Sequence, residues 1–132
     1  MVFVVKLTEY QLSTELHVKN TSSSDGLEFQ ALFHNYIRAP SNEVLIFPLQ
    51  HQFYYDKTAP AEEDRAKRKE ETREGVDVKK LTDSIYENAP QKYEVTWPEG
   101  GIGIRTTALK DVVVWNPQEM GSKIVDMEDG GW

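Results

Sequence analysis

The feature that most constrains the fold is the division of the chain into short segments of strand-like sequence, without a long apolar stripe at helical spacing. Apolar and polar residues alternate clearly at residues 11–19, the pattern of a β-strand with one buried face. Glycine and proline separate the segments, as at residues 98–101. We predict strands at residues 3–8, 11–19, 27–38, 43–49, 50–56, 81–86, 92–97, 103–107 and 111–115. Many short strands with such turns favour an all-β fold, an antiparallel β-sandwich.

Length, cysteine content and charge limit the classes of protein. With 132 residues the chain is predicted to be a single domain, residues 1–132. It has no cysteine, which excludes a disulfide scaffold, thiol catalysis and a cysteine-based zinc site. The net charge of -7 argues against nucleic acid and membrane partners, because both are bound by neutralising phosphate. The apolar run at residues 2–5 is too short for a signal peptide or a membrane span, so we expect a cytoplasmic location.

Residues 59–80 differ from the rest in composition, because charged residues of both signs leave almost nothing apolar to bury. Glu63 with Lys67, and Asp64 with Arg68, have the four-residue spacing that supports a solvated helix. We therefore expect a mobile charged loop or short helix here. An alternative is that the basic cluster at residues 65–69 binds a phosphate. The interleaved carboxylates would repel such a ligand and make this the weaker hypothesis.

The predicted strand at residues 27–38 carries the candidate site. Five apolar side chains fall on one face, with Asn35 as the exception, and the other face is mainly polar apart from Leu32. The apolar residues are Leu27, Phe29, Ala31, Phe33 and Ile37, and they oppose Glu28, Gln30, His34, Tyr36 and Arg38. We expect the turn at Asp25-Gly26 to join this strand to residues 11–19 as a hairpin. A row of His, Tyr and Arg along one face suggests the floor of a shallow binding site.

On residue chemistry alone, His34 is the candidate proton donor or acceptor, since imidazole titrates near neutral pH. A lone histidine is nevertheless more often structural than catalytic. No partner stands at metal-ligand spacing from His51, and the sequence has no glycine-rich phosphate loop. We therefore expect neither a metal nor a cofactor.

Four segments resemble the hexose-6-phosphate mutarotases, the glucose-6-phosphate 1-epimerases of the aldose-1-epimerase-like superfamily. They lie at residues 16–21, 29–38, 82–86 and 111–117, in the order and rough spacing of that family. The similarity extends from about residue 10 to 132 and is greatest to the fungal members. It implies a β-supersandwich fold and the interconversion of the α and β anomers of a hexose 6-phosphate.

The resemblance also implies roles for individual residues. The histidine of the family's Phe-His-x-Tyr-x-Arg stretch is the general acid, which carries over to His34. The aspartate of its Thr-Asp-x-x-Tyr motif holds sugar hydroxyls, which carries over to Asp83. Tyr36 and Arg38 share the strand face of His34, and we expect them to contact the substrate.

Two departures from the family pattern lower the expected activity. The family's general base is a Glu in a strand that would follow Gly130-Gly131-Trp132, where this sequence stops, and the family's N-terminal half has no counterpart. We therefore expect a truncated sandwich, weak or inactive alone, with exposed strand edges that form a homodimer or strand-exchanged oligomer. Two alternatives remain open. One is a non-catalytic carbohydrate-binding module, with Tyr36, Trp97 or Trp115 stacked on a sugar. The other is a sheet that recruits another protein.

Overall fold

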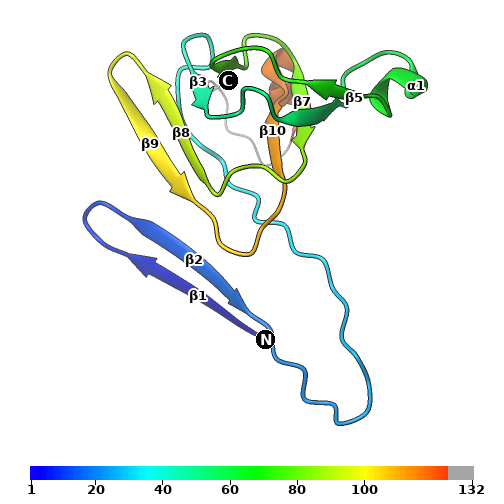
Figure 1. The fold of residues 1–132 in the computed structure, drawn as a ribbon. Helices are drawn as coiled ribbons and strands as arrows, with labels where there is room; N and C mark the ends of the chain where they lie inside the picture. The colour runs from blue at the N-terminus through cyan, green and yellow to red at the C-terminus, as the bar shows by residue number, and fades with distance from the viewer. Residues whose placement is uncertain (125–132) are drawn as a thin grey trace. The chain divides into compact units, whose positions relative to one another are not determined.

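A computed structural model of the chain describes residues 1–124. It consists of two compact units, Met1–Tyr36 and Ile37–Trp132 (Figure 1). Nearly all of the regular structure is antiparallel β-sheet, and α1 (Glu62–Arg65) is the lone α-helix among residues 1–124. The prediction of an all-β fold is therefore confirmed.

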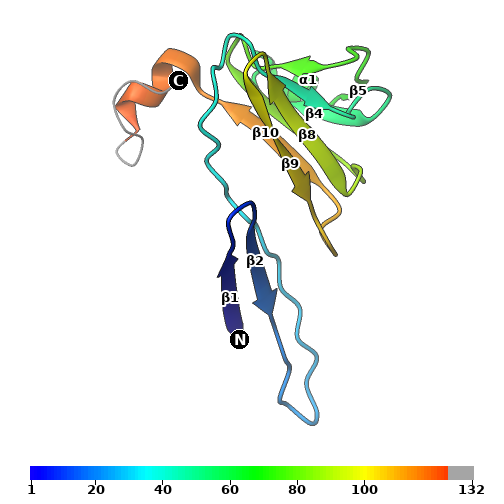
Figure 2. The same cartoon turned by 90° about the vertical axis from the view of Figure 1, so that its left-hand side faces the viewer.

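The first unit contains one β-hairpin (Figure 2). β1 (Val2–Leu7) pairs antiparallel with β2 (Leu12–His17), in a register that places Leu7 opposite Leu12. The Thr8 N–H closes the turn by donating to the Gln11 carbonyl at 2.8 Å. Both strands lie close to the ranges predicted from the sequence, residues 3–8 and 11–19. One face of the hairpin carries Phe3, Val5, Leu7, Leu12, Thr14 and Leu16, because opposite residues of paired strands share a face.

The prediction of a strand at residues 27–38 is wrong, because this segment has no regular secondary structure. The hairpin predicted at Asp25-Gly26 is also absent, since β2 pairs with β1 instead. Side chains close the loop before Gly26 locally. The Asp25 carboxylate accepts hydrogen bonds from Ser22 and Ser24 at 3.0 Å each, and Asn20 donates to the Asp25 carbonyl at 2.7 Å. Such local bonds compete with strand pairing.

The second unit contains two four-stranded antiparallel sheets, with strand orders β10-β7-β4-β5 and β6-β3-β8-β9. Consecutive strands often belong to different sheets, so the chain passes repeatedly between the two. A 3₁₀ helix, Gln118–Lys123, follows the last strand. The strands of this unit are β3 (Leu45–Phe47), β4 (Phe53–Asp56), β5 (Arg68–Glu70), β6 (Val76–Asp77), β7 (Thr82–Tyr86), β8 (Lys92–Trp97), β9 (Gly100–Arg105) and β10 (Val112–Asn116).

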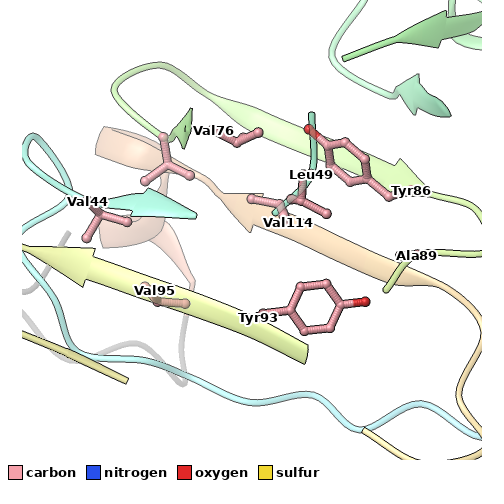
Figure 3. Close-up of a cluster of buried hydrophobic side chains, with 9 residues drawn as sticks. Val44, Leu49, Val76, Tyr86, Ala89, Tyr93, Val95 and Val114 are labelled. Atoms are coloured by element: carbon pink, nitrogen blue, oxygen red, sulfur yellow. The ribbon is translucent and has the colours of Figure 1, made fainter. Parts of the chain in front are cut away.

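Both sheets contribute to one hydrophobic core, as in a β-sandwich. Tyr93 and Val95 of β8 lie in the same cluster as Tyr86 of β7 and Val114 of β10 (Figure 3). Leu49, between β3 and β4, is fully buried in it. Because alternate residues of β7 and β10 point into this core, their neighbours point to the outer face of the sheet.

The charged stretch at residues 59–80 is more ordered than its composition predicts. The short helix α1 lies within it, but β5 and β6 are also there. Val76 and Val78 are buried in the core. The expectation that this stretch has almost nothing apolar to bury is therefore wrong for its last part, where two valines among the charges were too few to give a periodic signal.

A buried carboxylate anchors the same stretch to β7. The Glu71 side chain is 2% exposed and accepts hydrogen bonds from Arg73 Nε at 2.9 Å and Arg73 Nη2 at 2.8 Å. The Tyr86 hydroxyl donates to Glu71 Oε2 at 2.7 Å. Charge-assisted bonds of this kind offset the cost of burying an ionised carboxylate.

This network predicts loss of stability in acid. Burial raises the pKa of the Glu71 carboxyl, but the hydrogen bonds from Arg73 and Tyr86 outweigh it, so the pKa falls below its usual 4.5. A carboxyl with a lowered folded-state pKa stabilises fully above the unfolded-state pKa, and its contribution is lost as pH falls through the folded-state value. We expect the free energy of unfolding, measured by urea denaturation, to decline below about pH 4.5. The Glu71→Gln variant should decline less steeply, and equal slopes for both chains would contradict the assignment.

Candidate functional site

The first unit places His34 beside a small cavity against the apolar face of the hairpin. The cavity has a volume of about 210 Å³. Its lining combines hairpin residues with the irregular segment that follows: Phe3, Thr14, Leu16, Leu32, Phe33, His34 and Asn35. The rings of Phe3 and Phe33 lie 6.4 Å apart between centroids, which helps to hold the segment against β1. An imidazole at the edge of such a hollow could exchange a proton with a polar ligand.

Tyr36 lies next to His34, although the strand on which we expected the two residues to share a face is absent. The ring centroids are 4.8 Å apart and the ring planes are inclined by 43°. Both residues are exposed, so the two rings are accessible to a ligand. Although no strand forms here, the structure brings together two of the four predicted site residues. The other two, Asp83 and Arg38, belong to the second unit.

Asp83 lies on the outer face of its sheet, directly opposite Trp115 of β10. The core side of the sheet is occupied instead by Ser84 and Tyr86, two buried residues of β7 that lie two positions apart. Asp83 is half-buried, and Trp115 is 37% exposed. A carboxylate that accepts hydrogen bonds from vicinal hydroxyls, beside an accessible indole ring, is a combination that can bind a sugar.

Arg38 follows Tyr36 closely in sequence but is described with the second unit, where it is exposed. It precedes β3 in irregular chain. An exposed guanidinium can bind an anionic group in two hydrogen bonds. Its proposed contact with a substrate therefore stays a prediction.

Sequence reasoning considered Arg68 only as part of a charged helix or a basic cluster and did not predict that cations lie against aromatic rings on the outer face of this sheet. The Arg68 guanidinium lies 4.1 Å from the Phe53 ring centroid, and Lys57 Nζ lies 5.3 Å from that of Tyr55. Phe53 and Arg68 meet only because β4 and β5 pair, and nothing in their local sequence predicts that pairing. Aromatic side chains on this face are therefore found at Phe53 and Tyr55 of β4 as well as at Trp115, which lies opposite Asp83.

The basic cluster at residues 65–69 uses its charges within the protein. Its four cations each contact an oxygen: Arg65 the Ala59 carbonyl at 3.0 Å, Lys67 Asp64 at 2.7 Å, Arg68 Glu87 at 3.3 Å and Lys69 Asp56 at 3.0 Å. A phosphate would have to compete with these four partners, which are three carboxylates and one backbone carbonyl. The structure thus does not favour the phosphate-binding alternative.

Within residues 1–124, no group of three or more His, Asp or Glu side chains is placed to hold a metal ion. In the same part of the chain, no helix is long and apolar enough to cross a membrane. The cytoplasmic location stays a prediction.

The two units together define a class of protein: an antiparallel β-protein with polar and aromatic side chains on exposed faces. The model of the aldose 1-epimerase family matches residues 1–130 of the chain. Because the match covers nearly the whole sequence, the chain belongs to the aldose 1-epimerase family. No solved structure matches it. Aldose 1-epimerases act on sugars, which agrees with the chemistry that Asp83, Trp115 and His34 can offer.

Proposed function

We propose that this chain is a mutarotase-like protein that binds a hexose 6-phosphate, with His34 as its general acid. The observation that carries the proposal is the family match over residues 1–130, with His34 at the edge of a cavity. Asp83 holds sugar hydroxyls, and Tyr36 and Arg38 contact the substrate. The proposal includes the specificity for a 6-phosphate and the kinship with fungal members, both of which rest on the four sequence motifs.

Each proposed role follows from the chemistry of anomer exchange. The imidazolium of His34 protonates the ring oxygen while a base removes the proton of the anomeric hydroxyl. The bond between the anomeric carbon and the ring oxygen breaks, and an open-chain aldehyde forms. Rotation about the adjacent carbon–carbon bond followed by reclosure gives the other anomer. Histidine suits the acid step because its ordinary pKa lies near neutral pH.

We further propose that turnover by this chain is slow or absent. None of the residues lining the cavity beside His34 is a carboxylate, so the described lining supplies no general base. A positioned base contributes about 10²- to 10⁴-fold to the rate. The site then binds sugar better than it converts it.

The first test is the rate of α-to-β exchange of glucose 6-phosphate, measured by one-dimensional exchange NMR. We expect a small acceleration over the buffer rate that is lost in His34→Ala, because the ring oxygen is then no longer protonated. His17→Ala is the matched control: His17 is exposed on β2 and paired with Glu15 at 2.9 Å, away from the cavity lining. Unphosphorylated glucose, run in parallel, tests the specificity.

Three outcomes of this test contradict parts of the proposal. Equal loss in both histidine variants would remove His34 from its role. Equal rates with glucose would remove the phosphate specificity. Full activity, comparable to that of efficient enzymes, would show that a base is present and overturn the proposal of slow turnover.

A non-catalytic carbohydrate-binding module is the second candidate, favoured by the pairing of Asp83 with the exposed Trp115. Here we expect saturation-transfer NMR signals from glucose 6-phosphate that survive His34→Ala. Asp83→Asn and Trp115→Ala should each weaken binding by about tenfold, the effect of one lost charged hydrogen bond or stacking contact. Asp64→Asn, on exposed α1, is the control. Binding unchanged in both site variants would argue against this face.

A further inference from the structure

β1 is an edge strand. Among residues 1–124 it pairs with β2 and with no other strand. Hydrogen-bonded and non-bonded pairs alternate along an antiparallel ladder. Counting from the bond between Thr8 and Gln11, the peptide groups of Val4 face β2, and those of Phe3 and Val5 face the free edge. This edge therefore presents unpaired donors and acceptors.

The sequence of β1 lacks the devices that usually protect an edge. Natural edge strands carry charges, prolines or bulges that prevent pairing with another chain. β1 has no proline, and Lys6 is its only charged residue. Phe3 is 59% exposed and Val5 57% exposed. Valine and phenylalanine are also among the residues most favoured in strands, whereas β2 carries Glu15 and His17 along its length.

We propose that the β1 edge is the pairing surface for a second copy of this chain. In the antiparallel register centred on Val4, Phe3 lies opposite Val5 of the second copy, and Val4 lies opposite its own equivalent. Odd-numbered residues of one β1 then lie opposite odd-numbered residues of the other. Because Phe3 and Val5 belong to the apolar face of each hairpin, the two apolar faces become continuous across a four-stranded sheet. Lys6 lies opposite Val2, and no like charges meet along β1.

This pairing closes on itself. Each copy uses its β1 edge once, so a two-fold dimer leaves no further β1 edge free to extend the assembly. A lone two-stranded hairpin is marginally stable, whereas a sheet with more strands and one apolar face gains both hydrogen bonds and buried area. The proposal goes beyond the sugar chemistry and does not depend on it.

Charges placed on the two-fold axis test the register. In its own hairpin Val4 lies opposite Glu15, so Val4→Lys adds a favourable cross-strand pair within the monomer. In the dimer it brings two lysine ammonium groups face to face. We expect sedimentation velocity to show a concentration-dependent dimer for the original chain and a dimer at least about tenfold weaker for Val4→Lys. His17→Lys, which changes charge on the other strand, should dimerise normally.

Two further measurements complete the test. Mixing Val4→Lys with Val4→Glu should restore dimers, because opposite charges then meet at the axis. Val4→Cys should form a disulfide-linked dimer readily under mild oxidation, since the chain has no other cysteine and residues opposite in a ladder lie within disulfide reach. Leu12→Cys, on β2, is the control and should cross-link only slowly.

Several outcomes would overturn this assignment. These are a monomer at all concentrations, equal dimerisation of the original chain and both charge variants, equal cross-linking of the two cysteine variants, or assemblies larger than a dimer. Glucose 6-phosphate should leave the dimer unchanged. Dimerisation that requires the sugar would also contradict the proposal, whereas loss of sugar turnover alone would leave it standing.

Discussion

Arg73→Ala is expected to lower the free energy of unfolding by about 3 kcal/mol, at the low end of the cost of breaking a buried ion pair. The reason lies in Glu71, which is 2% exposed and would keep its charge without its guanidinium partner. Arg73 itself is 40% exposed, so water screens part of its interaction with Glu71. The upper part of the range for buried ion pairs therefore does not apply. Urea denaturation at pH 7, followed by circular dichroism, measures the difference.

A variant cycle separates the ion pair from other effects of this substitution. Glu71→Gln with Arg73→Ala should be more stable than Arg73→Ala alone, because no buried charge is then left unpaired. Arg65→Ala is the matched control, since Arg65, the half-buried last residue of α1, donates to the backbone carbonyls of Ala59 and Pro60 rather than to a buried carboxylate. It should cost less than about 1 kcal/mol. Equal losses in the two arginine variants would show that Glu71 does not depend on Arg73.

Leu49→Ala is expected to destabilise the second unit by about 2–5 kcal/mol, the range for emptying a fully buried leucine site. Leu49 is 0% exposed and packs in the cluster formed by both sheets (Figure 3). Its replacement removes apolar contacts and leaves a cavity that the flanking strands can fill only in part. Thermal denaturation followed by circular dichroism gives the shift in midpoint.

The control for this prediction is another leucine of the same unit. Leu81, just before β7, is 42% exposed, and its replacement by alanine should cost under about 1 kcal/mol. A similar loss in the two variants would mean that the core is not centred on Leu49. A loss restricted to Leu49→Ala would agree with one core shared by the two sheets.

Local patterns predicted much of this fold. The alternation in β2 and β8, and the short apolar runs in β1 and β10, are properties of neighbouring residues, and the structure has strands there. His34 and Tyr36 were predicted to share one face of a strand, but that strand is absent, and their adjacent rings lie on irregular chain. Residues 27–38 could form a strand only with a neighbouring strand as hydrogen-bonding partner. The presence of such a partner cannot be inferred from the pattern of adjacent residues.

By itself the sequence determined the fold class and the family, because strand periodicity and short motifs are written in consecutive residues. Tertiary structure decided which strands pair, that Glu71 is buried with Arg73 and Tyr86, and that Asp83 faces outward beside Trp115. Apart from the contact between Glu71 and Arg73, these interactions join residues far apart in the chain. Their free energy depends on the loss of water from both partners at once, and that occurs only when the sheets have assembled.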